Sequence, residues 1–291
     1  MKPLVLYHAN CWDGFCAAWV ARRALGDIEA VPVQYGQDPP DVNGREVFIL
    51  DFSYKRPVLN QMVGKARTLV LIDHHKTAAE DLAEFYSTNS ATIGTITRNR
   101  ASVYCIFDMD KSGGRLAWEF FRGDELKKFS NPEELVPWLV AYTEDRDLWR
   151  WKLPQSREVN AGLRSYPLDF GRWNALHELN PLGDLAFEGA AILRREQQII
   201  DEHVGHARAI EMDGHLILAV NATVLFSDIA GELAKDRPFG ACWFQRKDGK
   251  MQWSLRSDPK GVDVSEIAKR RGGGGHKHAA GFECDTVRDT I

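Results

Sequence analysis

The chain has 291 residues, which is enough for two ordinary domains or one large one, with a substantial hydrophobic core. Hydrophobic residues make up 44% of the chain and charged residues 27%, the composition of an ordinary soluble globular protein. The formal net charge of −4 argues against a general affinity for duplex nucleic acid, so any polyanion would have to be bound by a local basic segment.

Such a segment lies near the C-terminus. Residues 250–280 contain seven Lys or Arg and three Asp or Glu, although a run of charge is usually just a solvated surface. The five cysteines are odd in number and show no paired spacing, which indicates reduced thiols and a cytoplasmic setting. The N-terminus has no signal-peptide pattern, and no apolar run approaches the roughly 20 residues of a membrane helix.

Apolar segments of strand length alternate with helical patterns in the first part of the chain. Strands are predicted at residues 3–8, 29–35, 45–51, 67–73 and 101–108. Helices are predicted at 14–25, 56–66, 112–121 (with Ser112 as its N-cap) and 131–149. This alternation predicts a parallel sheet covered by helices on both faces, in a first domain that ends near residue 160.

The rest of the chain predicts a linker and a smaller domain. The pattern from about 168 to 206 is helical and less apolar, and 188–211 predict a long connecting helix. Strands are predicted at 214–221, 241–247 and 250–257, and helices at 226–234 and 263–270. The fold class is therefore α/β, with a parallel-sheet domain at 1–160, a helical linker at 161–210 and a smaller α/β domain at 211–291.

Acidic residues and histidines follow several of the predicted strands. The first predicted strand ends at His8, the third at Asp51, and the fourth at Asp73, His74 and His75. Asp13 begins the helix after the first strand, and Asp145 lies near the end of a later helix. The carboxyl ends of parallel strands lie along one edge of a sheet, where ligands bind. A single histidine there is more often structural, but several such ends together favour a metal site. Asp and His without paired thiolates favour an ion such as Mn²⁺, which can activate water for attack on phosphorus.

Two motifs together resemble a known family. The Asp73-His74-His75 triplet and the segment GGGGHKHAAGF at 272–282 are similar to the DHH phosphoesterase superfamily with its DHHA1 domain. That superfamily includes RecJ-like exonucleases, nanoRNase-type oligoribonucleases, cyclic-dinucleotide phosphodiesterases and exopolyphosphatase-like proteins. The resemblance extends over nearly the whole chain, since both domains and their order match.

The resemblance implies a role for each residue of the first domain. One metal ion would be held by His8 and Asp51, and a second by Asp13, Asp51, His74 and Asp145, with Asp51 bridging the two ions. Asp147 competes with Asp145 for the last position. His75 would face the phosphate, and Asp73 would support the site.

Cys11 departs from the family pattern. It stands where the family usually places an earlier aspartate of the first motif. Cys11 is therefore either an unusual thiolate ligand or the mark of a weaker or vacant first metal site, because thiolate is softer than Mn²⁺ prefers. A third interpretation is a small buried residue that fills space beside the start of a helix.

The glycine-rich segment predicts substrate binding. Gly273, Gly274 and Gly275 would let backbone N–H groups approach a phosphate, whereas a bare glycine run would usually be a flexible linker. The resemblance implies that this loop, with His276 and Arg256, binds a nucleotide or a terminal phosphate. A guanidinium group can contact two phosphate oxygens at once. His203 and His206, with Glu202, are interpreted as a solvated helix face rather than a metal site.

These inferences predict a hydrolase. We expect a DHH-type phosphodiesterase, dependent on one or two Mn²⁺ ions with Mg²⁺ or Co²⁺ as alternatives, that acts as an oligoribonuclease on short chains or on small nucleotides. The alternatives are a phosphomonoesterase or exopolyphosphatase-like hydrolase, and a nucleotide-binding module with weakened catalysis. The expected partner is a short oligonucleotide or nucleotide, without an extended duplex or a membrane, and a homodimer remains open.

Overall fold

The computed structural model describes residues 1–85, 93–98, 101–126, 128 and 132–285. The described chain forms two compact units, residues 1–192 (the first unit) and 193–291 (the second unit). Helix α8, Leu182–Gly205, passes from one unit into the other. No described helix combines the length and the apolar character that crossing a membrane requires.

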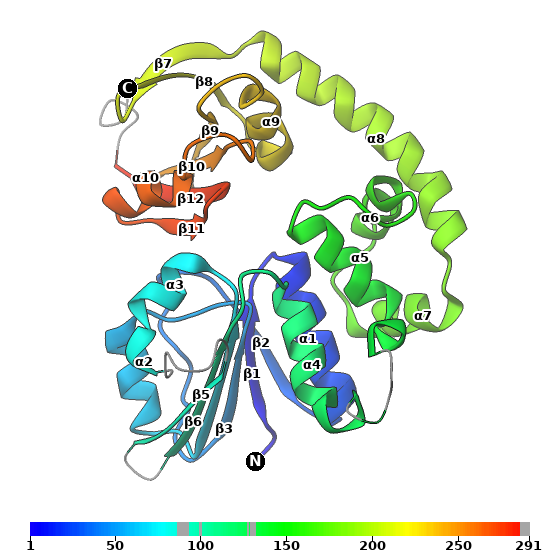
Figure 1. Ribbon diagram of the computed structural model, residues 1–291, viewed down its shortest axis with the longest axis vertical. Coiled ribbons are helices and arrows are strands. Elements are labelled where there is room, and N and C mark those ends of the chain that lie inside the picture. The colour runs from blue at the N-terminus through cyan, green and yellow to red at the C-terminus, as the bar shows by residue number, and fades with distance from the viewer. Residues whose placement is uncertain (86–92, 99–100, 127, 129–131, 286–291) are drawn as a thin grey trace. The chain divides into compact units, whose positions relative to one another are not determined.

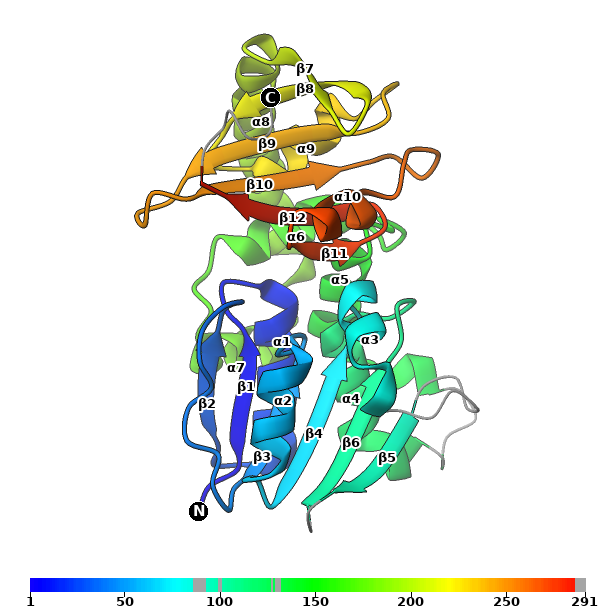
Figure 2. The same cartoon turned by 90° about the vertical axis from the view of Figure 1, so that its left-hand side faces the viewer.

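A six-stranded sheet forms the centre of the first unit. Its strands are β1 (Leu4–His8), β2 (Glu29–Val33), β3 (Glu46–Leu50), β4 (Thr68–Asp73), β5 (Ile93–Arg98) and β6 (Ala101–Phe107). They lie in the order β2-β1-β3-β4-β6-β5, which Figure 2 shows from left to right. Every pair is parallel except β5 with β6. The predicted parallel sheet is therefore confirmed, with the addition of an antiparallel edge strand that was not predicted from the sequence.

Helices cover both faces of this sheet, as Figure 1 shows. On one face lie α1 (Trp12–Leu25) and α4 (Gly113–Leu126), and on the other lie α2 (Arg56–Val63) and α3 (Lys76–Asp81). Alternate residues of a strand point to opposite faces of the sheet: Val5 packs with α1, while Leu4 and Leu6 pack with α2. Burial on both faces explains why these strands are apolar throughout.

The predicted helix over 131–149 is wrong as a single element. The described part consists of a short 3₁₀ turn, Pro132–Leu135, and helix α5, Trp138–Asp147. Pro137 is the N-cap of α5, and a proline both lacks an N–H and disfavours helical backbone at the residue before it. The helix therefore begins after the proline and ends two residues before the predicted limit.

Two further helices, α6 (Ser156–Arg164) and α7 (Phe170–Leu179), complete the first unit. Leu163, Trp173 and Leu176 pack into the same core as α1, so residues 161–192, which were predicted to belong to a linker, pack with the first unit. The connecting helix predicted at 188–211 is α8, but it begins at Leu182 and ends at Gly205. The residues after it form a strand instead, which corrects the predicted C-terminal limit.

The second unit contains another six-stranded sheet. Its strands are β7 (Arg208–Met212), β8 (His215–Asn221), β9 (Gly240–Gln245), β10 (Met251–Arg256), β11 (Gly274–His276) and β12 (Ala279–Cys284). They lie in the order β11-β12-β10-β9-β8-β7, which Figure 2 shows from bottom to top, and only β8 and β9 pair in parallel. Helices α9 (Phe226–Leu233) and α10 (Val264–Arg270) pack against this sheet, so the smaller α/β domain is confirmed.

Candidate metal centre and substrate residues

The carboxyl edge of the parallel sheet carries most of the predicted metal ligands. His8 ends β1, Asp51 follows β3 directly, and His74 follows β4 directly. The backbone of Asp51 is left-handed, with φ of 55°, and its N–H donates a hydrogen bond to the carbonyl of Ile72 at 2.9 Å. A non-glycine residue holds such a conformation only where its surroundings enforce it, which is common at functional sites.

Asp51 lies at the centre of the cluster. Its Oδ1 is 3.0 Å from Nε2 of His74, and its Oδ2 is 3.6 Å from Nδ1 of His8. Two groups of three potential metal ligands include it: Asp13, Asp51 and His74 form one group, and His8, Asp51 and His75 form the other. Within each group the ligand atoms lie within 4.8 Å of one another. A carboxylate common to two such groups is suited to bridge two cations.

Asp13 is held by the beginning of helix α4. The N–H groups of Gly113 and Gly114 donate to Oδ2 and Oδ1 of Asp13 at 2.5 and 2.9 Å. Helix N-termini leave such N–H groups unpaired and favour negative charge. A Cβ at Gly113 would lie 2.5 Å from Cβ of Asp51, so this approach requires glycine. This role was not predicted from the sequence, although the predicted N-cap is confirmed, since Ser112 Oγ accepts from the N–H of Arg115 at 3.2 Å.

The two aspartates near the end of α5 have different surroundings. Oδ2 of Asp147 lies 3.6 Å from Nε2 of His74. The carboxylate of Asp145 instead accepts backbone hydrogen bonds from Lys152, at 2.9 and 3.0 Å, and from Leu153, at 3.3 Å. The prediction preferred Asp145 with Asp147 as the competing choice, and it is Asp147 that the structure places beside the cluster.

Asp73 supports the second histidine of the triplet. Its Oδ1 lies 2.7 Å from Nδ1 of His75, and its Oδ2 accepts a hydrogen bond from Ser53 Oγ at 2.5 Å. Burial lowers the pKa of His75, but the charge of Asp73 outweighs this effect and holds the pKa above its ordinary value. Asp73 therefore orients the imidazole and favours its cationic form.

The cluster concentrates negative charge in a buried place. Burial and then the charge of Asp51 raise the pKa of Asp13 well above its ordinary value, and the same two causes raise the pKa of Asp147. Burial alone would lower the pKa of His74, but its hydrogen bond to Asp51 and the charges of the three aspartates raise it to about 10. The carboxylates thus repel one another and draw a positive charge toward them.

Two atoms of the cluster fit a bound cation. In the described part of the chain, His8 Nδ1 and Asp51 Oδ2 are buried and have no hydrogen-bond partner, although they face each other at 3.6 Å. Buried polar atoms without partners are rare and are typical of sites that bind water or an ion. Nitrogen and carboxylate donors in this number suit a hard or borderline divalent ion.

Cys11 does not belong to either ligand group among the described residues. It is the half-buried N-cap residue of α1 and lines a small cavity of about 30 Å³ together with Asp13 and Asp147. Burial, followed by the charges of Asp51, Asp147 and Asp13, raises the pKa of its thiol well above the ordinary value. These surroundings favour a neutral thiol that fills space over a thiolate ligand.

The substrate-binding residues predicted in the second unit lie on paired strands. The glycine segment is not an open loop, because Gly274–His276 form β11, which pairs with β12. A Cβ at Gly273 would lie 2.1 Å from the carbonyl oxygen of Gly281, and Gly275 has φ of 140°. Close strand approach and backbone conformation thus explain these two glycines.

Strand register puts Arg256 and His276 at the same level of the second sheet, on either side of β12. Both residues are paired with Ala279 of β12, Arg256 from β10 and His276 from β11. Directly opposite residues lie on the same face of a sheet, so these two side chains share a face and a level. Arg256 is further held by Ser227, whose Oγ accepts from Nη2 at 2.7 Å.

Comparisons with known proteins agree with this architecture. Residues 221–289 match the family model of the DHHA1 domain. The chain is 25% identical to the Oligoribonuclease NrnB of Bacillus subtilis (strain 168) over 303 residues, which cover 95% of this chain and 71% of that protein.

Two solved structures share the fold. One is described as the DHH domain of a member of the s1p family of ribosomal proteins, with a TM-score of 0.58, 14% identity and coverage of 99% of this chain and 84% of that chain. The other is RecJ in complex with Mn²⁺ from Thermus thermophilus, with a TM-score of 0.50, 15% identity and coverage of 98% and 50%. The chain therefore has the fold of these DHH-domain structures. The match to the DHHA1 model, the similarity to NrnB and the shared fold together support the DHH/DHHA1 superfamily.

Proposed function

We propose that the protein is a metal-dependent phosphodiesterase that hydrolyses short oligoribonucleotides. The observation that carries this proposal is the pair of overlapping ligand groups that share the buried carboxylate of Asp51. The similarity to a protein named Oligoribonuclease NrnB supports the substrate class. The RecJ structure, which was solved with Mn²⁺, supports the choice of that ion.

The proposed ligands follow from the distances. Asp13, Asp51, His74 and Asp147 would hold one divalent ion, and His8 and Asp51 would hold a second, with His75 beside it. A divalent ion bound there would supply Lewis acidity and lower the pKa of a bound water. The N–H groups of Gly113 and Gly114 keep the Asp13 carboxylate in place, and Asp73 keeps His75 oriented toward a role in binding phosphate.

The second unit would bind the substrate. Arg256 and His276 lie on one face of its sheet at the same level, with β12 between them, and a guanidinium and an imidazole on one face suit a phosphate group. Such a compact pair fits a short chain or a small nucleotide better than a long duplex, whose binding needs an extended track of positive charge.

The test is a substrate panel with purified protein. We expect release of mononucleotide from a 5′-phosphorylated RNA dinucleotide in the presence of Mn²⁺, and Asp51→Asn should lower kcat/KM at least about 100-fold, since even loss of a residue that only supports a metal ligand commonly costs about 10-fold to 100-fold. Asp27→Asn is the matched control, because Asp27 is exposed in the first unit and, among the described residues, forms an ion pair only with the exposed Lys2. Its activity should equal that of the unaltered protein.

Other substrates in the panel decide between reactions. Turnover of polyphosphate or of a nucleoside monophosphate at a rate above that of the dinucleotide would replace the diesterase proposal with a polyphosphatase or phosphomonoesterase. Binding of the dinucleotide without any turnover in Mn²⁺, Mg²⁺ or Co²⁺ would replace it with a nucleotide-binding module.

A further inference from the structure

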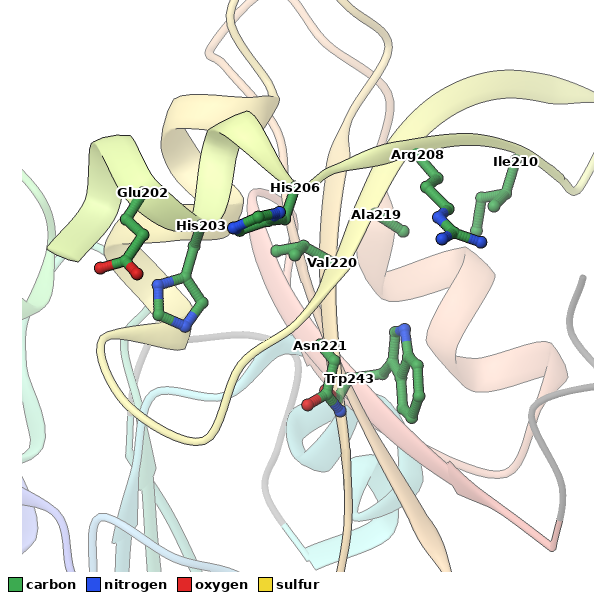
Figure 3. A pocket seen from close by; sticks show the side chains of 9 residues that line it. All are labelled: Glu202, His203, His206, Arg208, Ile210, Ala219, Val220, Asn221 and Trp243. Carbon is green, nitrogen blue, oxygen red and sulfur yellow. The ribbon is translucent and has the colours of Figure 1, made fainter.

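A hollow of about 560 Å³ lies in the second unit, apart from Arg256 and His276. It is lined by the end of α8 and by strands β7, β8 and β9, with the side chains of Glu202, His203, His206, Arg208, Ile210, Ala219, Val220, Asn221 and Trp243 (Figure 3). Its volume falls within the range of roughly 300–1,000 Å³ that is typical of small-molecule sites. The aromatic, cationic and amide side chains that line it restrict the class of ligand that it can bind.

Strand register places the main polar groups on one face of the sheet. Arg208 pairs with Ala219, Ala219 with Ala241, and Asn221 with Trp243. Trp243 in turn pairs with Trp253, which packs in the core beneath α10. Helix α10 packs mainly against β10, β11 and β12, and residues of β7, β8 and β9 line the hollow. Figure 3 shows the indole of Trp243 and the guanidinium of Arg208 on the same side of the hollow.

The end of helix α8 and the residue that follows it contribute Glu202, His203 and His206 to the hollow. Among the described residues, no metal-capable group contains Glu202, His203 or His206. Nδ1 of His203 lies 2.8 Å from the carbonyl oxygen of Ile199 and is used within the helix. The strands contribute Arg208, Asn221 and Trp243.

Trp243 offers a restrained flat surface. Its ring centroid lies 6.2 Å from that of the buried Trp253, at an interplanar angle of 34°, and the side chain is half-buried. A restrained indole loses little freedom when a planar ring stacks on it, and stacking of a base on an aromatic side chain is a strong and general contact. The surface beside it is apolar, from Ile210 and Ala219.

Beside this surface, Asn221 and Arg208 offer an amide and a guanidinium group that can distinguish one ligand from another. Nδ2 of Asn221 donates to the carbonyl of Trp243 at 3.0 Å, which fixes the amide and leaves its second N–H and its Oδ1 for a ligand. An amide with one donor and one acceptor matches the N6 and N7 edge of adenine. Arg208 is exposed, and no carboxylate in the described part of the chain forms an ion pair with it.

We propose that this hollow binds a nucleoside monophosphate, with the base against Trp243 and Asn221 and the phosphate at Arg208. Glu202 lies at the other end of the hollow, beside His203 (Figure 3), and its carboxylate disfavours phosphate there. This site is additional to the proposed hydrolytic centre. Its occupancy requires neither metal nor turnover, so it stands or falls separately from the proposed function.

The test is isothermal titration calorimetry of the full chain with AMP in the presence of EDTA. Arg256→Ala with His276→Ala serves as the background, so that binding at the proposed substrate residues does not contribute. We expect Arg208→Ala and Trp243→Ala each to weaken AMP binding at least about tenfold, and Trp243→Phe, which keeps an aromatic face, to stay within about threefold. Arg237→Ala is the control for Arg208, because Arg237 is an exposed arginine of the same unit outside the hollow.

The choice of base provides a second measurement. AMP should bind more tightly than UMP, and Asn221→Ala should abolish this difference, since uracil presents a different edge to the amide. Three results would overturn the proposal: no AMP binding at millimolar concentration, AMP binding that the background substitutions remove, or inorganic phosphate binding as tightly as AMP. Should Trp243→Ala prove misfolded by circular dichroism, the exposed Arg208→Ala and the conservative Trp243→Phe decide the matter.

Discussion

The two units position their candidate functional residues by different means. In the first unit, the ligands follow the ends of parallel strands, and the beginning of α4 secures one of them through the N–H groups of Gly113 and Gly114. In the second unit, Arg256 and His276 lie at the same level because both are paired with Ala279. A strand end is visible in a sequence as the point where an apolar run stops. A register is not visible, because it depends on which strands pair.

The largest expected effect tests the first means of positioning. Gly113→Ala should lower kcat/KM at least about 100-fold, because its Cβ would lie 2.5 Å from Cβ of Asp51 and 3.0 Å from Oδ2 of Asp13. Both aspartate side chains would have to move away from the beginning of α4. Metal content by mass spectrometry and turnover of a dinucleotide with Mn²⁺ measure the loss.

A glycine farther along the same helix provides the matched control. A Cβ at Gly123 meets nothing within 4 Å, so Gly123→Ala should keep full activity and raise the free energy of unfolding by about 0.5–1 kcal/mol. Equal activity of the two alanine variants would show that the site does not depend on the close approach of Gly113 to Asp13 and Asp51.

The second prediction separates two aspartates that lie on one helix. Asp147→Asn should weaken Mn²⁺ binding at least about tenfold, because its carboxylate lies 3.6 Å from Nε2 of His74. Asp145→Asn should leave Mn²⁺ affinity unchanged and cost about 1–3 kcal/mol of stability, because that carboxylate accepts the N–H groups of Lys152 and Leu153. Calorimetric titration with Mn²⁺ and urea unfolding measure the two effects, and the reverse assignment would restore Asp145 to the ligand set.

This pair of residues also shows how far the sequence could predict the site. His8, Asp13, Asp51 and His74 follow strand ends or begin a helix, and the structure brings them together. Asp145 and Asp147 belong to the same helix end, and a shift of two residues turns a side chain to another side of a helix. The role of Gly113 depends on a contact with a residue 100 positions away, which no local pattern contains.

The sequence likewise predicted the larger elements of the fold but not the strands that depend on pairing. The long apolar strands and the amphipathic helices are recognisable from periodicity. β11 has only three residues, two of them glycines, so its sequence is typical of a loop and its strand character comes from pairing with β12. The edge strand β5 is likewise defined by antiparallel pairing with β6.

The third prediction tests positioning by register. Gly273→Ala should cost about 1–3 kcal/mol of stability, because its Cβ would lie 2.1 Å from the carbonyl oxygen of Gly281 on the partner strand. Separation of β11 from β12 should also raise KM for the dinucleotide more than it lowers kcat, since it moves His276 away from Arg256. Gly231→Ala, on helix α9 with nothing within 4 Å, is the control and should stabilise slightly. An unchanged KM in Gly273→Ala would show that register does not position the substrate residues.

The smallest expected effect concerns an ion cluster that joins the turn after β7 to the end of α10. Asp213 accepts hydrogen bonds from Arg270 at 2.5 and 2.9 Å and also from Arg271. Although burial opposes the shift, these guanidinium groups hold the pKa of Asp213 below its ordinary value. A lowered pKa in the folded state means that the carboxylate stabilises the fold above the ordinary aspartate pKa and loses this effect as the pH falls toward the folded value.

The substitution Asp213→Asn isolates that charge, because Asn-Gly preserves the turn in which residues 213 and 214 have φ of 53° and 76°. At pH 7 the variant should be less stable by up to about 1 kcal/mol, since Arg270 is largely exposed and its ion pair is screened by solvent. Urea unfolding at pH 7 and pH 3 measures the difference, which should shrink at the lower pH as the carboxylate becomes protonated. A difference that is the same at both pH values would mean that the charge of Asp213 contributes nothing, and that the turn and strand register alone hold this corner of the second unit.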